Sequence, residues 1–219
     1  MTVKFNQYWR IDPEKTQEYE KHILTKFIPG VNQLGIHIVA GWVVLVGGYS
    51  EILCEGVTAD LHLLETALTH PKYKELNNEL LNFTKSYKTK VLVSSGKKET
   101  YSKDIKASTI KFTQAWDVVS QKKDGYEKFA MESFYPCLEE LGIKVAGEWE
   151  VIIGDGPRII CEGRAEEAHN FLENLQSPKF QKAKKELKQF VENYESRILT
   201  FHFQKVEGYK SQSYQLVAG

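Results

Sequence analysis

The chain has 219 residues with 29 basic and 29 acidic side chains, so its formal net charge at neutral pH is zero. A balanced chain produces no long-range field that would recruit nucleic acid or an anionic membrane, and we expect neither as a partner. Residues 1–6 contain no apolar signal segment, and no run of about 18 apolar residues is present to cross a bilayer. These features predict a cytoplasmic protein.

The chain contains an internal repeat. With an offset of about 107 residues, positions 4–92 align with positions 111–199 without a gap, and roughly 29 positions are identical. The repeat predicts two similar modules. Modules this small gain apolar burial when two copies share a face.

The module boundaries follow from the alignment. We assign the first module to 1–95, a polar linker to 96–109 and the second module to 110–203. The tail 204–219 lies outside the repeat. Its aromatic and aliphatic residues favour a position across a groove or a sheet edge, and disorder is the alternative.

Each module begins with a strand and a helix. In the first copy residues 3–11 are predicted as a strand, and Asp12-Pro13 are typical of a helix start. Apolar residues then recur at every fourth position, which gives one stripe for packing. Pro29 and its repeat equivalent Pro136 should kink or end these helices, and Gly35 suits the left-handed residue that follows.

A hairpin and a second helix complete the module. Two β-branched runs at 36–46 and 51–57 flank a glycine-containing turn, which joins two strands and is therefore not a phosphate-binding loop. A helix is expected over 59–68 and resumes at Pro71 to about Tyr87, before a last strand at 91–93. The predicted order is βαββαβ in both copies.

This order places both helices on one face of an antiparallel sheet and leaves the other face bare. The strands carry apolar or aromatic residues at both parities, which indicates burial on both sides. We therefore predict an α+β fold in which two ferredoxin-like modules pack sheet to sheet and close a pseudo-two-fold barrel within one chain.

Several segments resemble known proteins. Residues 27–29 with 34–42, and residues 134–136 with 141–149, resemble the helix-to-strand segment of NIPSNAP-like members of the dimeric α+β barrel superfamily. Pro71-Lys72-Tyr73 resembles the second-helix segment of that superfamily. The resemblance covers nearly all of both repeats and implies the barrel fold, but the superfamily hosts enzymes and ligand binders alike, so function does not follow from it.

The resemblance also bears on cofactors. Haem-degrading members place a haem-binding histidine one turn after the aromatic residue of the second-helix segment, and this chain has Asn77 and Lys184 there. We expect no haem and no other cofactor.

Twice-present residues on the strands are the first candidates for a site. Glu55 and Glu162, facing an enclosed space, would suit a general base; the alternative is that they reach solvent or a neighbouring lysine at the strand ends. The candidates for ligand binding are aromatic or amide side chains, which otherwise serve the core: Gln7, Trp9, Gln114, Trp116, Trp42 and Trp149.

Positions that differ between the copies form a competing set. Tyr8 corresponds to Ala115 and Asn6 to Thr113, so a phenol and an amide beside two small residues would leave a pocket. This set has the opposite parity to Gln7 and Trp9, and both sets cannot face inward. We favour the Gln7 and Trp9 parity for the interior and keep Tyr8 as a catalytic candidate.

No metal site is expected, because the sequence contains none of the usual histidine and cysteine spacings. His62 and His169 are assigned to surface or packing roles, and the cysteines to reduced packing positions. The lysine-rich helix at 182–188 has the alternating charges of a solvated face.

Three functions remain open. The first is a binding protein whose barrel holds a small, mostly apolar molecule. The second is a cofactor-independent monooxygenase or isomerase that uses an enclosed Glu, Tyr or Gln, and the third is an interaction scaffold with a filled barrel. A cavity between the sheets favours the first two, and association beyond the internal pseudo-dimer stays open.

Overall fold

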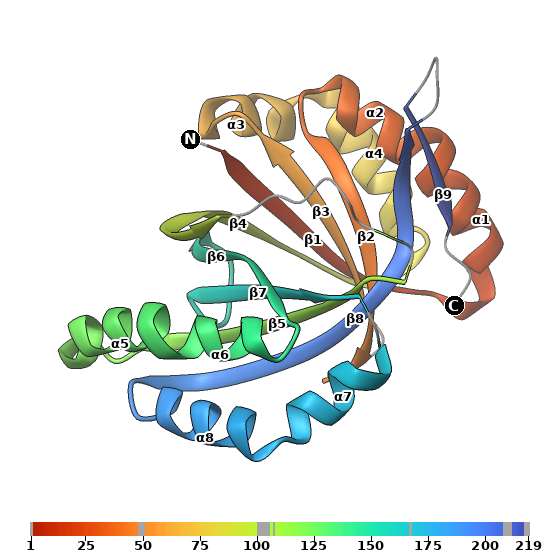
Figure 1. The fold of residues 1–219 in the computed structure, drawn as a ribbon. Helices are drawn as coiled ribbons and strands as arrows, with labels where there is room; N and C mark the ends of the chain where they lie inside the picture. The colour runs from red at the N-terminus through yellow and green to blue at the C-terminus, as the bar shows by residue number, and fades with distance from the viewer. Residues whose placement is uncertain are drawn as a thin grey trace.

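The computed structural model describes residues 2–47, 51–99, 106, 108–166, 168–207 and 212–216, with the backbone alone for 99, 168–169, 204–207 and 212–216. Two βαββαβ halves lie side by side, and their helices cover opposite outer faces of the strands (Figure 1). The predicted turn at 48–50, and 100–105 and 107 of the predicted linker, lie outside the described residues.

The strands of the first half are β1 (Val3–Ile11), β2 (His37–Val46), β3 (Ile52–Thr58) and β4 (Thr84–Glu99). Those of the second half are β5 (Ile110–Val118), β6 (Lys144–Ile153), β7 (Ile159–Ala165) and β8 (Val191–Glu207), and β9 (Gln212–Leu216) follows. β4 continues four residues past the boundary predicted at 95, and the boundaries themselves remain a prediction.

The first helical run of each half contains a π-helical turn before its proline. In the first half it consists of α1 (Thr16–His22), the π turn Ile23–Phe27 and α2 (Ile28–Gln33). In the second half it consists of α5 (Lys123–Phe129), the π turn Ala130–Phe134 and α6 (Tyr135–Glu140). The wider turn relieves the clash between a proline ring and the preceding carbonyl, so the proline does not end the helix.

The second helical run has a break at a proline, as predicted. Its parts are α3 (Leu61–Thr69) and α4 (Pro71–Leu81) in the first half, and α7 (Ala168–Gln176) and α8 (Pro178–Leu187) in the second. The helix predicted to reach Tyr87 ends at Leu81, and Tyr87 belongs to β4. The error has a physical reason: Thr84, Ser86 and Thr89 are weak helix formers, and the segment pairs with β1.

Eight strands form a closed antiparallel ring in the order β2-β3-β1-β4-β6-β7-β5-β8. Two seams join the halves: β4 pairs with β6, and β8 returns to pair with β2. Closure leaves no free edge within the ring, and the two four-stranded sheets therefore face each other as predicted.

The apolar residues form layers on both sides of the strands. One core of each half lies between its strands and its helices, around Trp9 in the first half and Trp116 in the second. Two further clusters lie inside the ring, around Trp42 and around Trp149. Burial on both faces of the strands is the arrangement that the mixed sequence pattern predicted.

The parity that we favoured for the interior is wrong. Trp9 packs on Tyr19 and Phe27 beneath the helices, and the Gln7 amide oxygen accepts a hydrogen bond from Tyr87. Gln114 and Trp116 occupy the same positions in the second half. The opposite parity faces the interior, because Trp9 and Trp116 pack against aromatic side chains of the helical runs.

Part of the tail extends the sheet. β9 pairs antiparallel with the end of β8, from Phe203 opposite Leu216 to Glu207 opposite Gln212. The prediction that the tail lies along a sheet edge is confirmed for these residues.

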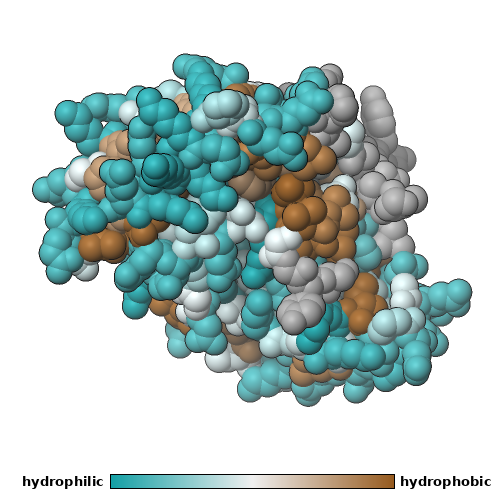
Figure 2. Space-filling model, turned by 90° about the horizontal axis from the view of Figure 1, so that it is seen from below, coloured by the Kyte–Doolittle hydropathy of each residue, from teal (hydrophilic) through white to brown (hydrophobic). Residues whose placement is uncertain are grey.

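The face shown in Figure 2 is largely hydrophilic, with hydrophobic residues gathered in small patches. Exposed apolar side chains include Leu45 and Val46 at the end of β2, and their repeat equivalents Ile152 and Ile153 at the end of β6. Among the described residues, no helix combines the length and apolar character needed to span a membrane.

Candidate functional site

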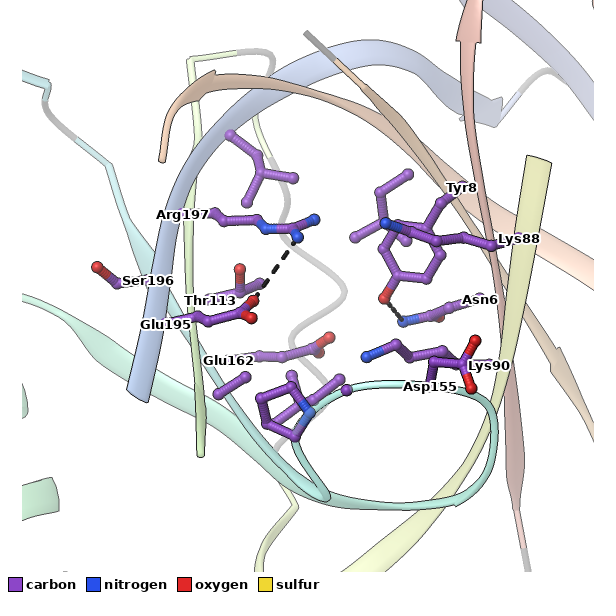
Figure 3. Close-up of a pocket in the computed structure, with 16 residues that line it drawn as sticks. Asn6, Tyr8, Lys88, Lys90, Thr113, Asp155, Glu162, Glu195, Ser196 and Arg197 are labelled. Atoms are coloured by element: carbon purple, nitrogen blue, oxygen red, sulfur yellow. Dashed lines mark hydrogen bonds and ion pairs between the residues drawn. The ribbon is translucent and has the colours of Figure 1, made fainter. Parts of the chain in front are cut away.

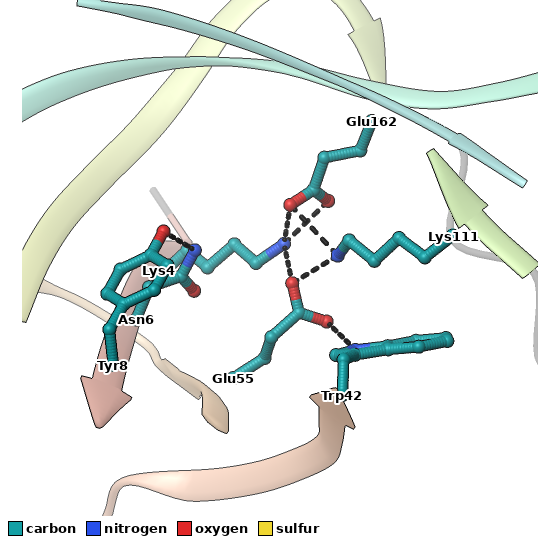
Figure 4. A network of polar contacts seen from close by, with 7 residues as sticks. All are labelled: Lys4, Asn6, Tyr8, Trp42, Glu55, Lys111 and Glu162. Atoms are coloured by element: carbon teal, nitrogen blue, oxygen red, sulfur yellow. Dashed lines mark hydrogen bonds and ion pairs between the residues drawn. The ribbon is translucent and has the colours of Figure 1, made fainter. Parts of the chain in front are cut away.

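Four charged side chains meet in the centre of the ring (Figure 4). Lys4 of β1 and Glu55 of β3 come from the first half, and Lys111 of β5 and Glu162 of β7 are their repeat equivalents. Lys4 Nζ lies 2.6 Å from Glu162 Oε2 and 2.8 Å from Glu55 Oε1. Lys111 Nζ lies 3.0 Å from Glu162 Oε1 and also pairs with Glu55. Each lysine therefore bridges the two halves.

Two tryptophans border this ion quartet of Lys4, Glu55, Lys111 and Glu162. Trp42 Nε1 donates a hydrogen bond of 2.7 Å to Glu55 Oε2, and Trp149 packs its ring 5.0 Å from Lys4 Nζ. All four charged side chains are at most 4 % exposed. The alternative in which the glutamates reach solvent is wrong, whereas contact with lysines is confirmed.

The quartet holds the Glu55 carboxylate ionised. Burial alone would raise the pKa of Glu55, but Lys111 and Lys4 outweigh burial and hold that pKa below its usual range. Burial also lowers the pKa of Lys111, and Glu162 and Glu55 oppose this effect. Glu55 and Lys111 form a buried ion pair, because the four charged groups of the quartet lie close enough to compensate one another. Glu55 is thus a poor proton acceptor.

Acid should weaken the fold through Glu55. A carboxyl whose pKa is depressed in the folded state stabilises the protein fully above its unfolded pKa of about 4.3, and this stabilisation is lost as the pH falls towards the folded value. We expect the free energy of unfolding to decrease between about pH 5 and pH 3, and to decrease less steeply in Glu55→Gln. Urea titrations across this range measure both slopes; equal slopes in the two proteins would contradict the assignment.

A cavity of about 220 Å³ lies beside the quartet, inside one end of the ring (Figure 3). Glu162 belongs to the quartet and also lines the cavity. The apolar part of the wall comes from strands of both halves, and it consists of Leu53, Ala115, Pro157, Ile160 and Leu199. The polar part consists of Asn6, Tyr8, Lys88, Lys90, Thr113, Asp155, Glu195, Ser196 and Arg197.

The competing set of sequence positions lines this cavity. Tyr8 and Asn6 lie beside Thr113 and Ala115, which face the interior but stay half-exposed because the cavity reaches them. Asn6 Nδ2 donates to the Tyr8 hydroxyl at 3.3 Å. Burial raises the pKa of Tyr8 to about 12, and the Asn6 hydrogen bond opposes this effect. Tyr8 therefore acts as a hydrogen-bond donor at neutral pH, and its catalytic role remains a prediction.

Two cations of the cavity wall share one acidic partner. Lys88 Nζ lies 3.0 Å from Glu51 Oε1, and Arg197 Nη1 lies 2.9 Å from Glu51 Oε2. Arg197 also approaches Glu195 at 3.7 Å. Lys90, between Lys88 and the centre of the ring, has no ion pair with any described residue.

A second polar centre, around Glu148, lies beneath the helices of the second half. Glu148 is fully buried, and its Oε2 accepts hydrogen bonds from Tyr126, at 2.7 Å, and from Tyr135. Lys97 Nζ lies 3.0 Å from Glu148 Oε1. The repeat equivalent of Glu148 is Gly41, so no carboxylate occupies the first half at this position.

The remaining candidates lie apart from the cavity. Gln7, Trp9, Gln114 and Trp116 face the helices, and their ligand-binding role remains untested. Trp42 and Trp149 border the quartet. Sequence reasoning missed Lys4 and Lys111, although a lysine repeated inside an apolar strand was a signal for a buried ion pair. Among the described residues no group of three or more His, Cys, Asp or Glu side chains is placed to hold a metal ion.

Comparison with known proteins shows which solved structures share this fold. No family model and no curated protein matches the chain. A candidate monooxygenase from Fusobacterium nucleatum matches with a TM-score of 0.64 and 11% identity, covering 98% of this chain and 97% of that one. A mutant chlorite dismutase from Candidatus Nitrospira defluvii matches with a TM-score of 0.63 and 10% identity, covering 91% of each chain.

This chain has the dimeric α+β barrel fold. It is a tandem duplication, so the pseudo-dimer of two halves lies within one polypeptide. A NIPSNAP domain protein from Burkholderia xenovorans aligns with 44% of this chain and 96% of its own length, at 15% identity and a TM-score of 0.36. At the 10% and 11% identity of the two full-length matches only the fold is shared, and the chemistry of the site must be argued from its own residues.

Proposed function

We propose that this α+β barrel protein binds a small, mostly apolar molecule in the cavity between its two sheets. The observation that supports this proposal is the cavity itself, whose wall contains apolar and polar side chains from both halves. Its volume of about 220 Å³ is below the roughly 300–1,000 Å³ typical of drug-sized ligands. The ligand is therefore a single ring or a short chain.

Two polar groups in the wall support an oriented ligand. The buried Asn6 Oδ1 has no hydrogen-bond partner within the described part of the chain. Lys90 likewise directs an ammonium group into the cavity without an ion pair to a described residue. Buried polar atoms are seldom left unsatisfied, so a ligand with a complementary polar end, or water in its absence, fits this wall.

Filling the cavity should abolish binding. Ala115→Trp places an indole where the ligand would lie, and we expect native mass spectrometry to find a small molecule retained by the wild-type protein and absent from this variant. Thr113→Phe is a second filling variant from the same wall. Ala59→Trp, on an exposed position before α3, is the matched control and should retain the molecule. Retention of the same molecule by Ala115→Trp and Thr113→Phe, both folded, would reject the cavity as the site.

A cofactor-independent monooxygenase or isomerase is the second candidate, because Glu162 and Tyr8 both line the cavity. The Fusobacterium nucleatum protein that matches this chain over its full length is a candidate monooxygenase, at 11% identity. Glu162→Gln distinguishes the two candidates: a binding protein keeps its ligand, whereas an enzyme that uses this carboxylate loses turnover of the retained molecule. The cavity of about 220 Å³ argues against the third function, an interaction scaffold whose barrel is filled by side chains.

A further inference from the structure

We infer that Lys90 is a reactive amine that condenses reversibly with a small aldehyde or ketone in the barrel cavity. The inference rests on the proposed binding function and assigns it a substrate class. In Figure 3 the Lys90 side chain extends from β4 and points its amine towards the centre of the cavity. Apolar and polar side chains of the cavity wall surround that point.

The amine is sheltered. The backbone of the turn between β6 and β7 passes over it: a Cβ built on Gly156 would lie 3.3 Å from Lys90 Nζ. Lys90 is half-buried, and no ion pair with a described residue holds its charge. A lysine in this setting differs from the lysines of the ion quartet, each of which contacts two carboxylates.

The charges around Lys90 are mixed. Lys88 on its own strand and Arg197 on β8 are cationic; Glu195 on β8, Glu162 on β7 and Asp155 in the turn are anionic. Burial lowers the pKa of Lys90, Glu195 opposes this effect, and Lys88 and Arg197 add to it. Desolvation and neighbouring cations are the two means by which proteins raise the neutral fraction of a nucleophilic lysine.

The reaction needs no oxidant or cofactor. The neutral amine nitrogen attacks the carbonyl carbon and forms a C–N bond, and proton transfer gives a carbinolamine. The C–O bond then breaks, its oxygen leaves as water after gaining a proton, and a C=N bond forms. Glu195 and Asp155 are carboxylates of the same wall and are the candidates to carry these protons, and the Tyr8 hydroxyl can donate a hydrogen bond to the carbonyl oxygen.

The two copies differ at this position. Lys90 corresponds to Arg197, and Tyr8 corresponds to Ala115, whereas all four residues of the quartet are identical in type between the copies. A guanidinium does not form an imine. The two equivalent positions therefore place a lysine amine from one copy and a guanidinium from the other at this cavity, and the first copy alone contributes the Tyr8 phenol.

Reductive trapping tests the inference. Limiting benzaldehyde with sodium cyanoborohydride converts an imine into a stable benzylamine, which peptide mass mapping locates. We expect one benzyl group per chain, on Lys90, before the exposed lysines react. Lys90→Arg keeps the charge and should lose this adduct; Lys72→Arg, the same change on the exposed face of α4, should keep it.

Binding of benzyl alcohol, which cannot form an imine, separates the two proposals. If NMR shows that it binds and that Ala115→Trp abolishes binding, while benzaldehyde labels only the exposed lysines, the imine inference is overturned and the binding function stands. If neither probe occupies the cavity and no retained molecule is found, both are rejected. A benzyl adduct at Lys90 that is lost in Lys90→Arg supports both the binding function and the imine inference.

Discussion

Replacing Lys111 with methionine is expected to lower the free energy of unfolding by about 3–5 kcal/mol, because it leaves the buried carboxylates of Glu55 and Glu162 short of one cation. Lys111 is 1 % exposed and pairs with both glutamates. Methionine matches the length of the aliphatic stem, so the loss reports the charge and not a cavity. Urea denaturation at neutral pH measures the effect.

The control for Lys111→Met is a second substitution that restores the charge balance of the quartet. Lys111→Met with Glu55→Gln removes one charge of each sign, and the double variant should lose less stability than the sum of the two single variants. Lys72→Met breaks the exposed pair with Glu75 and should cost less than about 1 kcal/mol. Additive losses, or a Lys111→Met protein as stable as the wild type, would show that the quartet is not electrostatically coupled.

Replacing Phe203 with alanine should also cost about 3–5 kcal/mol, because Phe203 is fully buried at the seam where β8 closes the ring on β2. Its ring lies against the Gly41 backbone: a Cβ built on Gly41 would meet the Phe203 ring at 2.3 Å. Thermal and urea unfolding measure the loss.

The converse change tests the same contact. Gly41→Ala should destabilise the protein by about 1–3 kcal/mol through overpacking, and less so when Phe203 is leucine. Leu172→Ala, at a side chain 48% exposed on α7, is the control and should be nearly neutral. A Phe203→Ala protein that unfolds like the control would show that the β2–β8 seam does not depend on this side chain.

Duplication explains why one barrel has both a symmetric centre and an asymmetric end. The quartet uses one Lys and one Glu from each half, so a single pair of strand positions, copied once, produces four mutually compensating ions. Away from the axis the copies are free to diverge, and they differ at Lys90, at Tyr8 and at Glu148. Lys90 and Tyr8, two of these differing positions, line the cavity.

The candidate site was predictable in part. Glu55 and Glu162 were identified from their repeated positions, and the Tyr8 and Asn6 set was recognised as a pocket-forming alternative. The choice between the two parities failed, because strands that are buried on both faces show no alternation to separate inside from outside. The bonds between Lys4 and Glu162 join residues 158 positions apart, a separation that no local pattern spans.

The sequence by itself determined the duplication, the βαββαβ order and the need for each sheet to cover a bare face, since these follow from periodicity, turn residues and repeat identity. Only the tertiary structure decided which parity faces inward, how β8 closes on β2 and which lysines meet which glutamates. Those outcomes depend on side-chain volume and on pairing between distant strands, and both are properties of the assembled barrel.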